Sequence, residues 1–150
     1  MIAQPSFASR DQNVGRFSVE FELTNYEDVV QNRTGHLPAE KVRRCRVSGV
    51  VDTGAARLVL PESAADELGL RETGLIPVRY ADGRREHRPL VVDAQVEIQN
   101  RSGVFSAVVE SGRTDALIGA IVLEELDLVA DCTSQCLVPR DPEGPLTEIE

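Results

Sequence analysis

The sequence Val50-Val51-Asp52-Thr53-Gly54-Ala55 decides the fold, because an apolar run ends on an acid and a glycine follows two residues later. A lone ionised carboxylate is costly to bury, so Asp52 must be paired, hydrogen-bonded or partly neutralised. Gly54 permits a tight turn or a close backbone approach, and the Thr53 hydroxyl can bond locally and hold the loop. The same three residues are also ordinary turn formers. The interpretation of Asp52 therefore depends on the segments that follow it.

The next segments repeat the pattern of a short apolar strand, a turn and a helix. Residues 57–61, Arg-Leu-Val-Leu-Pro, predict a strand, and residues 62–68 predict a short helix that ends at Gly69. Further along, Ala116-Leu117-Ile118-Gly119-Ala120 again joins two apolar residues to a glycine and leads into a helix over 121–126. The segments around Asp52 and Gly119 thus form a faint internal pair.

Together these segments resemble the retroviral-type (retropepsin-like) aspartic proteases. The matching residues are Asp52-Thr53-Gly54-Ala55, Leu58-Val59-Leu60-Pro61 and Leu117-Ile118-Gly119, and a hairpin with Tyr80-Ala81-Asp82-Gly83 at its tip is similar to that family's flap. The resemblance covers roughly residues 41–139. It implies an all-β fold, a small closed barrel with one or two short helices and a β-hairpin flap. The regular spacing of short strands and turns independently favours a barrel.

The resemblance implies a homodimeric aspartic endopeptidase. In this chemistry two carboxylates share a proton and activate a water, and no metal or cofactor is needed. The chain has one Asp-Thr-Gly, and its second motif, Leu117, Ile118 and Gly119, carries no acid at the matching place. Two copies must therefore meet at a two-fold axis, each donating Asp52. Thr53, Gly54 and Ala55 would support the loop, while Tyr80, Ala81, Asp82 and Gly83 would close over a peptide or protein substrate.

Some residues depart from the family pattern. Ala56 and Ala120 stand where the viral enzymes carry polar residues. Ala120 replaces an arginine that commonly follows the second glycine, and either Arg57 takes the place of that arginine in its ion pair or no residue does. One alternative is a non-catalytic dimeric binding module on the same fold; another is a plain β-barrel in which Asp52 is a turn acid. The charged flap tip, residues 82–88, suggests substrates with polar or acidic flanks.

Composition narrows the class of protein. The chain has 150 residues, enough for one domain, and its net charge of −9 argues against nucleic acid as the main partner. No apolar run approaches the roughly 18 residues that a membrane-spanning helix needs. The three cysteines are odd in number, and the first residues do not resemble a signal peptide, so we expect reduced thiols and a cytoplasmic protein. Cys132 and Cys136 are too sparse for a zinc site.

The remaining pattern defines the domain. We expect a loose N-terminal lead over 1–15, a protease domain over 16–139 and a solvated acidic tail over 140–150. Residues 17–23 alternate cleanly and predict a half-buried strand, whereas 25–40 are polar and predict a loop. Residues 75–80 predict an edge strand, since it contains Pro77, and a strand over 89–98 should place Val92, Ala94, Val96 and Ile98 on one face. The other expectations are a turn over 100–103, a central strand over 104–109, a strand over 126–131 and a last strand over 135–139 that adds to the dimer sheet.

Overall fold

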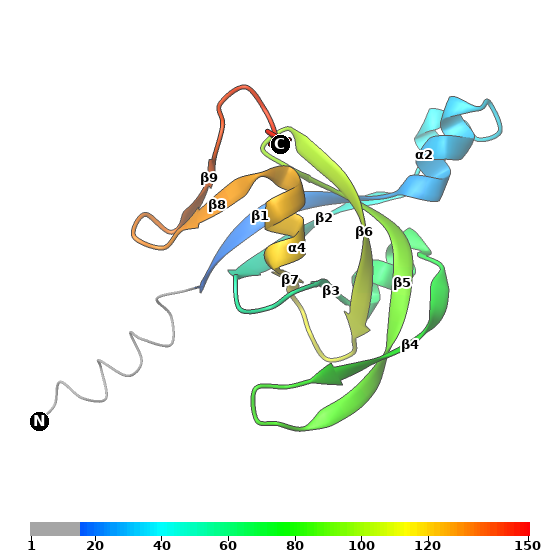
Figure 1. Cartoon of the computed structure of the whole chain (residues 1–150). Helices are drawn as coiled ribbons and strands as arrows, with labels where there is room; N and C mark the ends of the chain where they lie inside the picture. Colours follow the sequence, from blue (N-terminus) through cyan, green and yellow to red (C-terminus); the bar gives the residue numbers. More distant parts are fainter. Residues whose placement is uncertain (1–15) are drawn as a thin grey trace, which may run out of the picture.

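The computed structural model describes residues 16–150, and the predicted N-terminal lead lies outside them (Figure 1). Its strands are β1 Arg16–Asn25, β2 Arg44–Asp52, β3 Leu58–Pro61, β4 Glu72–Arg79, β5 Arg85–Ile98, β6 Arg101–Glu110, β7 Ala116–Ile118, β8 Leu128–Asp131 and β9 Cys136–Pro139. Its helices are α2 Tyr26–Arg33, the 3₁₀ turn η1 Ala39–Lys41, α3 Glu62–Leu68 and α4 Ala120–Leu126.

The main sheet closes into a barrel. Its strand order is β1-β2-β7-β3-β6-β5-β4, and the end of β1 also pairs with β5, so six strands form a ring and β4 is left as the free edge. β8 and β9 form a separate two-stranded sheet. The prediction of an all-β closed barrel is confirmed, and Pro77 lies on the edge strand as expected.

The barrel core is built by alternation along the strands. In β1 the side chains of Phe17, Phe21 and Leu23 point inward and are buried, while the polar residues between them face out. Leu60 from β3 and Ile118 from β7 are fully buried beside them. The sequence pattern of residues 17–23 therefore reports the inner face of the barrel.

The prediction of a loop over 25–40 is wrong for Tyr26–Arg33, which form α2, a helix that projects from the barrel (Figure 1). Asn25 caps the helix: its side-chain oxygen accepts the Asp28 N–H at 3.1 Å, and its amide nitrogen donates to the Leu68 carbonyl at 2.8 Å. The Asp28 carboxylate accepts from Arg43 Nε at 2.8 Å and Nη2 at 3.0 Å. The helix is thus held by its cap and an ion pair, not by an apolar face, so hydrophobic periodicity does not reveal it.

The predicted inward face of residues 89–98 is wrong at Val92. A bulge shifts the register between Val91 and Ala94, and Asp93 takes the left-handed conformation with φ 61°. As a result Val91 and Ala94 are both buried. An extra residue in one strand flips the side chains that follow, and the alternation alone does not place it.

The turn after β5 also differs from the prediction, since it is made by Gln99 and Asn100, both with positive φ. Arg101 already belongs to β6 and is 7% exposed. Its guanidinium donates to the carbonyls of Leu126 and Asp127 at 3.1 and 2.9 Å. Arg101 therefore ties the hairpin to the end of α4.

The C-terminal segment is mostly exposed, but hydrogen bonds attach part of it to Asp127. Asp127 accepts from Arg140 Nε at 2.5 Å and from the Leu146 backbone N–H at 3.0 Å. Arg140 also donates to the Leu146 carbonyl at 3.1 Å. The hydrogen bond from Arg140 lowers the pKa of the Asp127 carboxyl. The chain up to Leu146 is therefore attached, and most residues beyond 140 are exposed.

Candidate active site

Asp52 is the last residue of β2, at one end of the barrel. β2 lies between β1, which runs antiparallel to it, and β7, which runs parallel. Val51 is fully buried and pairs with Ile118. The two motifs that the sequence separates by more than sixty residues therefore lie side by side, with the Asp52 loop next to Gly119.

The Asp52 carboxylate is half-buried and has partners on both oxygens. Its Oδ1 accepts the Gly54 N–H at 3.0 Å, and its Oδ2 lies 3.2 Å from Arg16 Nη2. The side chain is 17% exposed. The requirement that this acid be paired and hydrogen-bonded is met by one backbone amide and one guanidinium.

Arg16 is a partner that sequence reasoning missed. It is the cross-strand neighbour of Asp52 in the β1–β2 ladder, so the two side chains share one face of the sheet. The alternation of residues 17–23, continued by one position, places Arg16 on the outer face, but only the strand register reveals which residue it faces.

The loop after Asp52 is held against the second motif. The N–H groups of Ala120 and Ile121, at the start of α4, donate to the carbonyls of Ala55 and Ala56 at 2.8 and 3.0 Å. A Cβ on Gly119 would lie 2.6 Å from the Arg57 carbonyl oxygen. Glycine is required at 119 because the loop backbone passes directly over it, and this close approach fixes the loop that follows Asp52.

Thr53 is exposed at the tip of the loop. It lines a hollow of about 400 Å³ together with Leu123 of α4 and Val129 and Ala130 of β8. In the part of the chain that the structure describes, no hydrogen bond is formed by its hydroxyl. Thr53 thus lies beside α4 and β8.

The hairpin of β4 and β5 forms the predicted flap. Its turn is closed by the Gly83 N–H donating to the Tyr80 carbonyl at 2.9 Å and the Tyr80 N–H donating to the Arg84 carbonyl at 2.8 Å. Gly83 has φ 88°, a conformation that glycine adopts without strain. Asp82 Oδ1 accepts the Arg84 N–H at 2.9 Å. The Asp-Gly turn is where the sequence predicts it.

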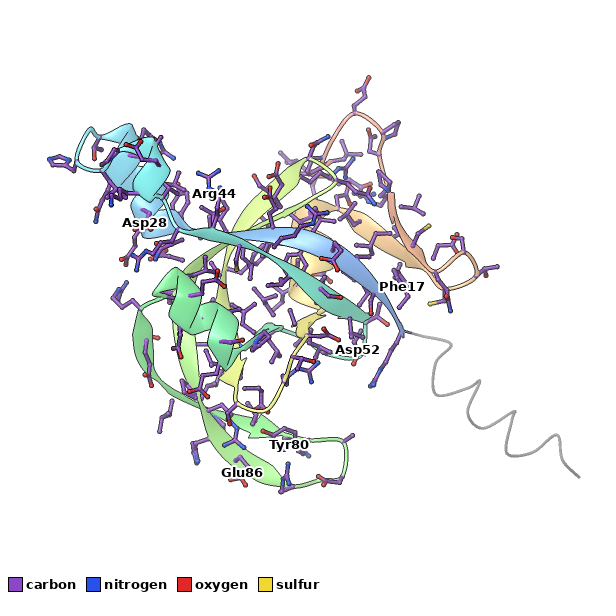
Figure 2. The ribbon with its side chains drawn as sticks, turned by 180° about the vertical axis from the view of Figure 1, so that it is seen from behind. Phe17, Asp28, Arg44, Asp52, Tyr80 and Glu86 are labelled. Carbon is purple, nitrogen blue, oxygen red and sulfur yellow. The ribbon has the colours of Figure 1, made fainter. Side chains whose placement is uncertain are left out.

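A cleft separates the flap from the Asp52 loop. Figure 2 shows Asp52 and Tyr80 on its two sides, and one hollow of about 610 Å³ is lined by both of them with Ala81 of the flap and Leu117 of the second motif. Gly54 and Ala55 line the same hollow. Asp82 and Gly83 are exposed at the tip and do not line it. The structure therefore brings most of the predicted site residues to one cleft.

Tyr80, at the start of the flap's turn, is fixed by a polar network. Its hydroxyl donates to Glu110 Oε1 at 2.6 Å, and Arg88 Nε donates to the same oxygen at 2.8 Å. The Arg84 guanidinium lies 4.5 Å from the centre of the Tyr80 ring. The hydrogen bond to Glu110 raises the pKa of Tyr80, because it is made by the protonated hydroxyl. Glu110, at the end of β6, is a second residue that sequence reasoning missed.

Arg57 does not extend toward another charge. Its Nη1 donates to Ser106 Oγ at 3.1 Å. Among residues 16–150, no group of three or more side chains is placed to hold a metal ion, and all three cysteines are free. No helix in these residues is long and apolar enough to cross a membrane.

The chain is similar to known aspartic proteases in sequence pattern and in structure. The chain matches the family model described as "Aspartyl protease" over residues 41–131, more than half of its length. No curated protein gives a significant match. Among solved structures, it is similar to the EIAV protease complexed with the inhibitor HBY-793, at 16% identity and a TM-score of 0.46, over 53% of this chain and 75% of that one.

Proposed function

This chain belongs to the aspartyl protease family and is an aspartic endopeptidase, and from that premise we propose that its active form is a homodimer with one Asp52 from each subunit. The observation that carries the proposal is the single half-buried Asp52, held by its neighbours at the mouth of a cleft that faces the flap. A water between two such carboxylates would be the nucleophile.

The proposed chemistry depends on two acids at short range. Like charges a few ångströms apart do not both ionise, an effect for which aspartic proteases are the standard example. The ionised Asp52 would take a proton from the water, and the protonated Asp52 of the partner subunit would donate to the scissile carbonyl. The two carboxyl groups titrate as a pair. In this scheme the ion pair with Arg16 has to loosen as the second Asp52 approaches.

A surface beside Thr53 supports the homodimer. Ile121, Val129 and Val138 are apolar yet 46%, 48% and 40% exposed. Val129 and Val138 are cross-strand partners in the β8–β9 sheet, and Val129 lines the hollow that Thr53 also lines. An exposed apolar surface next to the active-site loop is what a second copy of this chain would cover. We therefore propose that the interface extends to β9, the strand that the sequence predicts would add to the dimer sheet.

The flap is proposed to close over an extended peptide. Tyr80 and Ala81 face the cleft, while the hydrogen bonds from Tyr80 and Arg88 to Glu110 hold the hairpin near its turn. Closure would exclude bulk solvent from the reacting bond and leave the nucleophilic water in place. Under this proposal Thr53, Gly54 and Ala55 support Asp52, and the protease domain spans residues 16–139. The free cysteines are consistent with a reducing compartment such as the cytoplasm.

The test compares wild type, Asp52→Asn and Asp66→Asn on a mixed peptide library from pH 4 to pH 8. Asp66 is an exposed acid on α3 and serves as the matched control. Cleavage by the wild type and the control but not by Asp52→Asn, with unchanged circular dichroism, is the expected result. Equal cleavage by Asp52→Asn would refute the catalytic role of Asp52.

Sedimentation of the same samples tests the dimer. We expect a concentration-dependent dimer for the wild type and a monomer for a Val129→Asp, Val138→Asp double variant, which should also lose cleavage. A wild type that stays monomeric with and without substrate, and cleaves nothing, would favour the non-catalytic binding module instead.

A further inference from the structure

The cleft between the flap and the Asp52 loop is lined by an unusual number of arginines. The hollow of about 610 Å³ contains Arg16, Arg79 and Arg113, and the adjoining hollow of about 380 Å³ adds Arg57 and shares Arg79 and Arg113 with it. The two hollows contain two acids, Asp52 and Glu110. The chain as a whole has a net charge of −9, so this concentration of positive charge is local and opposite in sign to the rest.

Both acids of the cleft already have cationic partners. Glu110 accepts from Arg88 Nε at 2.8 Å, and Asp52 lies 3.2 Å from Arg16 Nη2. In the single subunit, their negative charge is therefore compensated by Arg16 and Arg88.

The remaining three arginines have no carboxylate partner among the described residues 16–150. Arg113 Nε donates to the Asp115 backbone carbonyl at 3.0 Å, and Arg57 Nη1 donates to Ser106 Oγ at 3.1 Å. Within the same part of the chain, Arg79 makes no side-chain hydrogen bond or ion pair. A guanidinium offers a fork of donors that fits a carboxylate, and a concave site lined by one sign of charge attracts the opposite sign.

We propose that the substrates are acidic peptides, and that Arg79 of the flap and Arg113 of the loop before β7 bind carboxylate side chains flanking the scissile bond. This inference rests on the proposed function, since it names the substrate class of the same site. Arg79 is exposed on the hairpin and Arg113 is half-buried opposite it, so the two reach the cleft from different sides. In a two-fold symmetric dimer each subunit brings the same pair, and acidic residues are therefore favoured on both sides of the scissile bond.

The test uses paired peptide libraries that differ only in Glu or Gln at the flanking positions. The wild type, Arg79→Gln, Arg113→Gln and the double variant are compared with Arg44→Gln as the matched control. Arg44 is an exposed arginine at the opposite end of β2 from Asp52 (Figure 2). For the wild type we expect kcat/KM to be about tenfold higher on the Glu library, from two partly exposed ion pairs acting together.

The Glu-to-Gln ratio should fall toward one in the double variant and stay at the wild-type value in Arg44→Gln. It should also fall in about 1 M salt, where the screening length is only about 3 Å. A ratio of one for the wild type, or a ratio that survives the double substitution, would overturn the inference.

Binding of the same labelled peptides to Asp52→Asn, measured by fluorescence anisotropy, distinguishes recognition of acidic peptides from the proposed catalytic chemistry. Selective binding of the Glu peptides without any cleavage by the wild type would refute the proposed chemistry but keep the acidic ligand. Cleavage without Glu selectivity would keep the proposed chemistry but refute the acidic substrate class. Absence of both cleavage and binding would overturn both.

Discussion

Replacing Gly119 with alanine tests how the second motif holds the Asp52 loop. The added Cβ would lie 2.6 Å from the Arg57 carbonyl oxygen, 2.7 Å from the Ala56 carbonyl carbon and 2.8 Å from the Ala55 carbonyl oxygen. All three atoms are backbone, so no side chain can rotate away, and the loop itself must move by several tenths of an ångström. Overpacking of this kind costs about 1–3 kcal/mol of folding free energy.

The loss of activity should exceed what the loss of stability explains. A domain stabilised by about 5 kcal/mol and weakened by 3 still has roughly thirty folded molecules for each unfolded one. The shifted loop, however, carries Asp52, whose carboxylate is positioned by the Gly54 N–H. A displacement approaching 1 Å lowers catalysis by about a hundredfold. We expect kcat/KM to fall by that order while circular dichroism stays native.

Gly49→Ala provides the matched control. Its Cβ would meet Phe21 Cε1 at 2.7 Å and Ile118 Cδ1 at 2.9 Å, which are side chains inside the barrel. Urea unfolding should show both variants destabilised, and only Gly119→Ala should lose most of its cleavage. Wild-type kcat/KM in a folded Gly119→Ala variant would refute the idea that this contact positions Asp52.

Three further perturbations address the rest of the structure. Asn25→Ala removes the cap of α2 and the bond to α3, so urea unfolding should show a loss of about 1–3 kcal/mol; a loss within error would contradict the anchoring role. The hydrogen bond from Arg43 lowers the pKa of Asp28. The ionised Asp28 therefore contributes fully to folding stability above its unfolded-state pKa of 3.8, and this contribution is lost as pH falls through the lower pKa of the folded state. The stability gap between wild type and Asp28→Asn should therefore narrow below pH 3.8, and a gap independent of pH would exclude this ion pair as its cause. Tyr80→Phe removes the donor to Glu110, and KM should rise by about threefold to tenfold as the flap loosens, with faster hydrogen exchange of the hairpin amides; unchanged exchange would rule out the anchor.

The barrel was predictable from sequence where a local pattern, such as strand alternation or a helix-ending glycine, determines the structure. Residues 17–23 alternate because one face of β1 is buried, and α3 ends at Gly69, which takes the left-handed conformation with φ 61°. α2 was not predictable from apolar periodicity, since its stability comes from the Asn25 cap and the Asp28–Arg43 pair. Arg43 follows Asp28 by 15 positions, so no local sequence pattern links the two residues.

The site was predictable in its motifs and not in its cross-strand partners. Asp52 and Gly119 carry a recognisable pattern because their loop geometry demands particular residues. Arg16 and Glu110 are single charged residues on strand ends, and their roles depend on the register of the β1–β2 ladder and on where the flap folds back. Such positions are set by long-range pairing, which a single sequence does not encode locally.

The parallel pairing of β2 with β7 has a consequence for synthesis of the protein. Residues 116–121 follow Asp52 by more than sixty positions, yet they supply the neighbouring strand and the two N–H groups that clamp the Asp52 loop. A chain still emerging from the ribosome, or one cut within residues 111–115, carries the acid without the surface that shapes its loop. Such long-range contacts form late in folding. The order of translation therefore delays formation of the Asp52 loop, since its neighbouring strand and clamp are made only after nearly the whole barrel.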